Sequence, residues 1–218
     1  QRYTFAERYA ELLQYHDASW INIWCATSAY YHALRGEAEK IPKIFSQHRL
    51  STVNMLAPGK PMMEMIENQV YLAQGAYAKV VGRSAELLAV CEAMHYALVA
   101  LHIRIQTAAA YEKLGKTEEA RVWLRKALAD AEPDSFVMPF VENYDCLQPI
   151  LAREMKNDLI VKITGLGEAA KARNAASVRP AAFDVLTARE FEIVELMVQR
   201  LSNREIAEKL YLSEGSVK

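Results

Sequence analysis

The stretch LTAREFEIVELMVQRLSNREIAEKLYLSEGSVK, residues 186–218, contains three successive helix-start signals. Two of them have the capping-box pattern, a hydroxyl residue followed three positions later by glutamate. In this motif the hydroxyl accepts a bond from a free backbone N–H, and the carboxylate accepts one from the N–H of the cap residue. The capping pairs are Thr187 with Glu190 and Ser202 with Glu205. Ser213 is a third N-cap residue, so the stretch predicts three short helices.

Apolar residues flank each of these caps at the two positions of a hydrophobic staple. The staple pairs are Leu186 with Phe191, Leu201 with Ile206, and Leu212 with Val217. Only the segment Leu210-Tyr211-Leu212 separates the second helix from the third, which is the spacing of a helix-turn-helix. Ala207 is small, so the third helix can cross the second closely.

The same stretch resembles the C-terminal DNA-binding domain of LuxR-type transcriptional regulators. The positions that match the family pattern are Leu186, Thr187, Arg189, Glu190, Leu201, Ser202, Asn203, Glu205, Ile206, Ala207, Leu210, Ser213, Val217 and Lys218. Ser216 replaces the usual threonine conservatively. Arg200 stands where the pattern has glycine, and this is a real departure because glycine readily ends a helix in a left-handed conformation.

The resemblance implies that the third helix enters the DNA major groove and that the start of the second helix contacts the phosphate backbone. The expected DNA-binding residues are Asn203, Arg204, Ser213, Glu214, Ser216, Val217 and Lys218. It also implies promoter DNA as a partner and a homodimer on that DNA. In the family the recognition helix continues and a further helix supplies the dimer contact. We therefore expect the domain at 184–218 to be truncated, and chain 1–218 to bind DNA weakly or not at all; nanomolar binding in a gel-shift assay would contradict this.

Composition bounds the class of protein. The chain has 218 residues, 52% of them hydrophobic, and a net charge of −1, so it offers a sizeable core and no overall basic signal for nucleic acid. It contains no apolar run of membrane-spanning length and no signal-peptide pattern. Cys25, Cys91 and Cys146 are odd in number and widely spaced, which favours reduced thiols in a cytoplasmic protein.

Upstream of residue 155 the sequence predicts helices and no strand, so we expect an all-α fold. Helix breaks fall at Gly36, 58–61, Gly75, Gly115 and 133–135, and Thr117 is the expected cap of a helix over 118–131. Tyrosines recur at a spacing of forty, each followed after four or five residues by glycine. These tyrosines are Tyr31, Tyr71 and Tyr111.

This periodicity, clearest in AAYEKLGKTEEARVWLRKAL at residues 109–128, resembles a tetratricopeptide helix pair, although the usual period is about 34. The arrangement is similar to the helical-repeat sensor domain of the large regulators related to the maltose-regulon activator. We therefore expect a tetratricopeptide-like sensor or interaction domain at 1–155, a linker at 156–183 and the helix-turn-helix domain at 184–218. No cofactor is expected in this chain, because a nucleotide-binding module of such regulators would lie before Gln1.

In a helical solenoid the first helix of each pair lines the concave face. The residues expected on that face are Asn22, Cys25, His32, Gln69, Ala73, His102, Ile105 and Glu112. Their mixture of polar and apolar side chains suits a small ligand, a peptide or a partner helix as the unknown inducer. The alternative is that they are ordinary solenoid core and surface.

Other candidate sites favour simpler interpretations. Gly115-Lys116-Thr117 lacks the first glycine of a phosphate-binding loop, since Ala110 stands there. Glu92 and His95 have metal-ligand spacing, but no second such pair exists. We expect no metal site, no catalytic set and hence no enzyme. The main interpretation is a bacterial-type DNA-binding transcriptional regulator; the alternative is a helical-repeat interaction scaffold without DNA binding.

Overall fold

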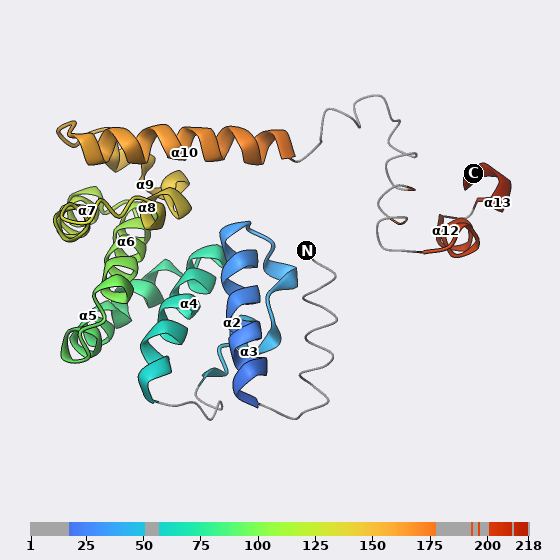
Figure 1. Cartoon of the computed structure of the whole chain (residues 1–218), viewed down its shortest axis with the longest axis horizontal. Helices are drawn as coiled ribbons and strands as arrows, with labels where there is room; N and C mark the ends of the chain where they lie inside the picture. The colour runs from blue at the N-terminus through green and yellow to red at the C-terminus, as the bar shows by residue number, and fades with distance from the viewer. Residues whose placement is uncertain are drawn as a thin grey trace. The chain divides into compact units, whose positions relative to one another are not determined.

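A computed structural model describes residues 18–50, 57–177, 193, 196, 201–210 and 212–217. All regular elements in this described part are helical, which confirms the predicted all-α class (Figure 1). None of the described helices combines the length and apolarity needed to cross a membrane. The chain divides into two compact units, residues 1–168 and 169–218, which are treated separately below.

The helices of the first unit follow one another at short intervals. They are α2 (Ala18–Leu34), η1 (Ala38–Lys40), α3 (Lys43–Ser46), η3 (Ala57–Gly59), α4 (Lys60–Ala73), α5 (Tyr77–Ala93), α6 (Ala97–Lys113), α7 (Thr117–Ala131), α8 (Met138–Glu142), α9 (Tyr144–Leu151) and α10 (Asp158–Ser177), which runs past the division. Helices α4, α5, α6 and α7 pack on one another in succession, and α2, α4, α6 and α9 also touch in succession. The unit is therefore a layered array of helix pairs (Figure 1).

Four helix ends in this array share one backbone turn at intervals of twenty residues. Gly75, His95, Gly115 and Ser135 have φ angles of 74°, 57°, 73° and 53°. After each of them, an N–H bonds back to the carbonyl five residues earlier, as in Ala76 to Tyr71 at 2.8 Å and Tyr96 to Cys91 at 2.8 Å. This is the Schellman motif. The spacing of forty seen in the sequence thus corresponds to two helices with one such turn each.

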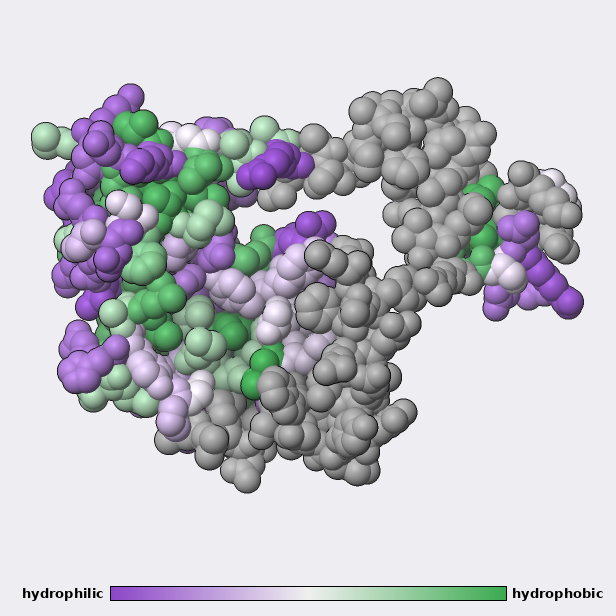
Figure 2. Space-filling view, viewed as in Figure 1, coloured by the Kyte–Doolittle hydropathy of each residue, from purple (hydrophilic) through white to green (hydrophobic). Residues whose placement is uncertain are grey.

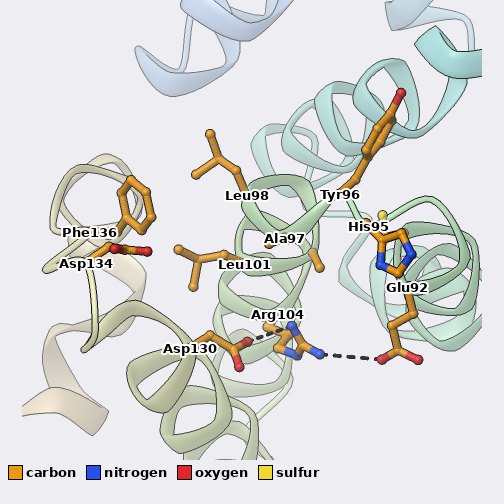
Figure 3. Close-up of a pocket in the computed structure, with 12 residues that line it drawn as sticks. Glu92, His95, Tyr96, Ala97, Leu98, Leu101, Arg104, Asp130, Asp134 and Phe136 are labelled. Atoms are coloured by element: carbon orange, nitrogen blue, oxygen red, sulfur yellow. Dashed lines mark hydrogen bonds and ion pairs between the residues drawn. The ribbon is translucent and has the colours of Figure 1, made fainter.

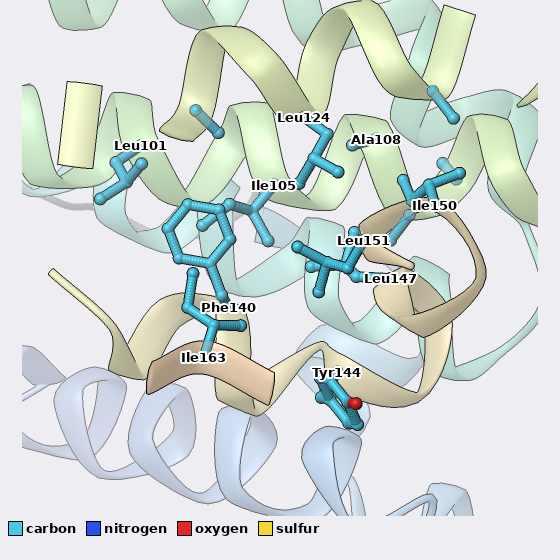
Figure 4. Packing of buried hydrophobic residues seen from close by; sticks show 14 of the residues in the cluster. Leu101, Ile105, Ala108, Leu124, Phe140, Tyr144, Leu147, Ile150, Leu151 and Ile163 are labelled. Carbon is cyan, nitrogen blue, oxygen red and sulfur yellow. The ribbon is translucent and has the colours of Figure 1, made fainter. Parts of the chain in front are cut away.

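Apolar side chains fill the space between the layers. One cluster joins α6, α7, α8, α9 and α10 and includes Ile105, Leu124, Phe140, Leu147 and Ile163, all with 0% exposure (Figure 4). A second cluster joins α2, α3, α4, α5 and α6 around Phe45 and Ile103. Because α6 contributes to both clusters, it connects the two halves of the unit.

Most of the stretch predicted as a tether, 156–183, is helical in the structure. Residues 158–177 form α10, and Leu159, Ile160 and Ile163 are buried at 6%, 5% and 0% exposure. The composition, rich in alanine, suggested a linker, but alanine is the strongest helix former. The three apolar residues make a stripe that packs on the core, so the array continues past residue 155.

The expected cap of α7 is wrong. Helix α7 begins at Thr117 and its N-cap residue is Lys116, without a side-chain cap bond. Helix α7 thus begins one residue earlier than expected, directly after the turn at Gly115. Its first hydrogen bond runs from the N–H of Ala120 to the carbonyl of Lys116, at 3.0 Å. The three repeating tyrosines do lie near the ends of α2, α4 and α6, each before a left-handed glycine. Their burial differs, since Tyr31 is 45% exposed and Tyr71 only 8%.

Candidate functional site

In the second unit, helix α12 (Asn203–Leu210) begins with the predicted capping box. The N–H of Ser202 donates to Oε2 of Glu205 at 2.8 Å, and the N–H of Glu205 donates to Oγ of Ser202 at 3.4 Å. The hydroxyl of Ser202 also donates to Oε2 of Glu205 at 2.7 Å. These bonds to the charged form lower the pKa of Glu205. The start of α12 is therefore held by one pair of side chains.

Helix α13 (Glu214–Val217) follows after a short turn and starts at the predicted cap, Ser213. The N–H of Ser216 donates to Oγ of Ser213 at 3.2 Å, and the two hydroxyl oxygens lie 2.8 Å apart. The N–H of Leu212 donates to the carbonyl of Ala207 at 2.9 Å, which closes the C-terminal end of α12. The two helices and this turn form the predicted helix-turn-helix.

A small apolar core holds this unit together. Leu196, Ile206 and Ala207 are buried at 7%, 0% and 5% exposure. The half-buried residues packed against them are Ile193, Leu201, Leu210 and Leu212. Leu201 and Ile206 thus meet as their staple pattern predicts. On the other side of α12, hydrophilic side chains gather (Figure 2), and they belong to Arg204, Glu205, Glu208 and Lys209.

Four of the expected DNA-binding residues can be placed with their side chains. Asn203 is half-buried at the start of α12, and the side chain of Arg204 is 80% exposed. Ser213 and Ser216 are exposed at the start of α13. Glu214 and Val217 belong to α13 with side chains outside the description, and Lys218 lies outside the described residues, as do Thr187, Glu190, Phe191 and Arg200. The placed residues lie at two neighbouring helix starts, and their contact with DNA stays a prediction.

The expected concave-face residues of the first unit differ in their exposure. Ile105 is fully buried, and Gln69 is 5% exposed, so these two predictions are wrong. Gln69 instead donates to Oδ1 of Asn143 at 3.1 Å and accepts from Gln106 at 3.0 Å. The remaining members are half-buried: Asn22, Cys25, His32, Ala73, His102 and Glu112.

His102 belongs to a partly buried polar cluster that the sequence did not reveal. The hydroxyl of Tyr30 donates to Oε2 of Glu142 at 2.6 Å, and Nδ1 of His102 lies 3.4 Å from that hydroxyl. Burial lowers the pKa of His102 to about 4 and raises the pKa of Tyr30 and of Glu142. The three groups come from α2, α6 and α8, so no spacing in the sequence links them.

A pocket of about 440 Å³ opens between the His95 turn and the segment around Phe136 (Figure 3). Arg104 lies in it and pairs with Asp130 at 2.6 Å and with Glu92 at 3.6 Å. Leu98 and Phe136 face it while 49% and 41% exposed. Glu92 is therefore engaged by arginine, and among the described residues no group of three metal-ligating side chains converges. None of the expected concave-face residues lines this pocket.

A second pocket, of about 620 Å³, lies on α4 and α5 beside His48. It too is lined by none of the expected concave-face residues. Its lining includes the charged and aromatic side chains of Lys60, Tyr71 and Lys79. Helical periodicity in the sequence distinguishes only surface positions from core positions, so it does not indicate that these residues share a pocket. Sequence reasoning missed both pockets because neither is built from a motif.

The comparisons with known proteins agree with the geometry of the second unit. Residues 184–218 match the family model GerE, described as bacterial regulatory proteins, luxR family. No curated protein and no solved structure matches the chain. The chain therefore carries a LuxR-family helix-turn-helix domain at residues 184–218 and is a DNA-binding transcription regulator.

Proposed function

We propose that the helical array of the first unit is a tetratricopeptide-like sensor that controls promoter binding by the LuxR-family domain. The observation that carries the proposal is the capped pair α12 and α13, matched by the family model, in the same chain as an array with two pockets. The inducer is a small ligand or a protein partner, and the DNA-bound form is a homodimer.

The DNA-binding residues act in two groups. Asn203 and Arg204 stand at the start of α12, where the positive end of the helix dipole and the guanidinium favour contact with phosphate. Ser213 and Ser216 stand at the start of α13, the helix that enters the major groove. Glu214, Val217 and Lys218 complete the second group. In this cytoplasmic regulator the first group positions the domain and the second contacts the bases.

Immunoprecipitation of the protein from its own cells, followed by sequencing of the bound DNA, tests the DNA-binding part. We expect enrichment at discrete promoters that Ser216→Glu abolishes, because the added carboxylate faces the DNA phosphates. The matched control is Glu208→Gln, an exposed change on α12 that should keep the enrichment. Promoter enrichment that Ser216→Glu leaves intact would contradict the assignment.

The sensing part is tested by a thermal-shift screen of the chain against sugars, acyl compounds and peptides. A ligand that binds only the native state raises the melting temperature by mass action. Each ligand found in this way is then added to cells or to the immunoprecipitation assay. We expect promoter occupancy to change with an inducer, and a set of tight ligands with no effect on occupancy would contradict sensing.

A further inference from the structure

The pocket of about 440 Å³ lies between two turns that share one backbone conformation (Figure 3). His95 and Ser135 hold the left-handed position of these turns, at φ 57° and 53°, where glycine stands in the other two turns of the series. A residue with a β-carbon is strained in this conformation. Each of the two is followed by an aromatic residue that lines the pocket, Tyr96 or Phe136. The array thus carries side chains, at a cost, at the turns that border this pocket.

Ion pairs occupy one side of the pocket. The guanidinium of Arg104 lies between Asp130 and Glu92, at 2.6 Å and 3.6 Å (Figure 3). These acids stand in the last turns of α7 and α5, and neither turn contains a basic residue. The C-terminal end of a helix carries negative partial charge, so acids there are unfavourable without a cation. Arg104 therefore offsets these two acids and is not free to attract an anion.

Asp134 brings a further carboxylate to the other side of the pocket. It is exposed, and within the described residues it makes no hydrogen bond or ion pair. Figure 3 shows its carboxylate pointing into the pocket, toward Leu101 of α6. An apolar side chain offers this carboxylate no partner, and the end of α7 just before it adds negative partial charge. This side of the pocket therefore favours a positive charge.

Large apolar side chains lie exposed beside Asp134. Leu98 is 49% exposed and Phe136 is 41% exposed, while Leu101 between them is buried. Leu98 and Leu101 point toward Phe136 across the pocket (Figure 3). A pocket of a few hundred cubic ångströms with apolar walls and a few charged groups is typical of small-ligand sites. The face of an aromatic ring attracts positive charge, so a carboxylate next to Phe136 suits an organic cation.

We propose that this pocket binds a small organic cation, a primary amine with an aryl or alkyl body. Its ammonium group pairs with Asp134, and its body lies between Leu98 and the ring of Phe136. This proposal rests on the proposed function in one respect: the amine would be the inducer that the sensor unit recognises.

Titration of the chain with 2-phenylethylamine and with hexylamine, followed by the amide signals of the protein in NMR, tests the site. The controls are 2-phenylethanol, which lacks the charge, methylamine, which lacks the body, and 3-phenylpropionate, which has the opposite charge. We expect the better of the two amines to bind with a dissociation constant of about 1 mM and to shift signals of residues 97–101 and 134–136. 2-Phenylethanol should bind about fivefold more weakly, the effect of losing one ion pair near the surface. Silence of both amines, or any control that binds as tightly as the better amine, overturns the proposal.

Matched variants locate the binding. Asp134→Asn should weaken the amine about fivefold, and Phe136→Ala about threefold through the lost contact of the cation with the ring. Glu132→Gln removes the same charge two residues away, at an exposed position outside the lining. It should leave the affinity within about twofold, because salt screens charges that do not touch the ligand. If Phe136→Ala loses its helical circular dichroism, Asp134→Asn decides. Affinity that Asp134→Asn retains, or that Glu132→Gln lowers equally, overturns the site.

The titration needs no DNA, so the two proposals fail separately. Amine binding without any change in promoter occupancy keeps the site and contradicts its role in sensing. Failure of the titration, with promoter enrichment intact, removes the amine site and leaves the LuxR-family function standing.

Discussion

Gly167 in α10 lies directly against the aromatic ring of Tyr144 in α9, where a β-carbon on residue 167 would overlap the ring. Tyr144 is 4% exposed, and its hydroxyl donates to Oε1 of Glu168 at 2.7 Å. Gln148 donates to the same oxygen at 2.9 Å. The close approach of the two helices therefore depends on glycine at 167, and it makes the first half of α10 part of the helical array.

Gly167→Ala should destabilise the protein by about 1–3 kcal/mol, the usual cost of inserting a methyl group into a well-packed contact. Urea denaturation followed by circular dichroism measures the change. Gly165→Ala is the matched control in the same helix, because nothing lies within 4 Å of its β-carbon position. It should stabilise by up to about 1 kcal/mol, the difference in helix propensity. A loss of stability of equal size in both variants would show that the Tyr144 contact is not the cause.

Gly115→Ala should destabilise by about 1 kcal/mol, because residue 115 is left-handed at φ 73° and an L side chain is strained there. The β-carbon position has free space around it, so the cost is in the backbone alone. His95 makes the same turn at φ 57° and already bears this strain. His95→Gly should therefore be neutral or stabilising in the same denaturation experiment. We expect the free energy of unfolding to fall in Gly115→Ala and to stay the same or rise in His95→Gly. Destabilisation by both variants would contradict this explanation.

Several helix ends of this array could be predicted from the glycines in the sequence. Glycines at 75 and 115 mark helix ends in the sequence and in the structure alike. A left-handed backbone costs glycine less free energy than it costs any residue with a β-carbon. His95 and Ser135 take the same conformation without any such signal. Only the regular interval of twenty, visible once the helices are in place, reveals them as members of the series.

Among the candidate sites, those formed by neighbouring residues could be predicted from the sequence, and those formed by distant residues could not. Ser202 and Ser213 could be assigned as caps because capping is local, set by residues within one turn of each other. Ile105 was misplaced because the face of a residue in a repeat depends on helix length and crossing, which the sequence does not contain. The Tyr30–Glu142 bond and the pocket at Lys79 join residues far apart in the chain, so no local pattern predicts them.

The stability of the array should depend on pH through His102. Burial lowers the pKa of this histidine from 6.5 to about 4, so between these values the unfolded chain binds a proton that the folded chain does not. Stability is therefore fully present above pH 6.5 and falls as the pH drops through this window, by at most about 1.4 kcal/mol per pH unit. Urea denaturation from pH 4 to 7 measures the slope.

His102→Gln removes this contribution and should flatten the slope. The facing groups are Tyr30 and Glu142. Burial raises the pKa of Glu142, so its contribution has the opposite sign and weakens the fold as the pH rises above 4.5. The variant should therefore show a flat or falling dependence over the window. An unchanged slope in His102→Gln would mean that another group titrates.

Ser202→Ala should lower the local stability of α12 by about 1 kcal/mol, because it removes the oxygen that accepts from the N–H of Glu205 and the hydroxyl that donates to the carboxylate, while the bond from the backbone N–H of residue 202 remains. Hydrogen exchange of the amides in residues 203–210 measures this as faster exchange. Glu208→Gln is the control, since Glu208 is exposed and takes no part in the cap. Equal exchange rates in Ser202→Ala and the unmodified protein would contradict the capping role.

Arg204→Ala should weaken DNA binding without unfolding α12. The Arg204 side chain is 80% exposed, and its bond of 3.3 Å to Glu208 is a surface pair worth about 0.3–0.5 kcal/mol in a helix. Loss of one phosphate contact should weaken all DNA sequences alike and reduce the slope of log affinity against log salt concentration by about 1. Fluorescence anisotropy on a promoter recovered by immunoprecipitation, across a series of salt concentrations, measures both.

Glu208→Ala separates this electrostatic role from the surface pair itself. It removes the same pair from the other side and deletes a negative charge beside the expected phosphate position, so binding should hold or strengthen. If the two variants weaken binding equally, the pair acts through the structure of α12. If only Arg204→Ala weakens it, with the reduced salt slope, the guanidinium itself contacts the DNA backbone.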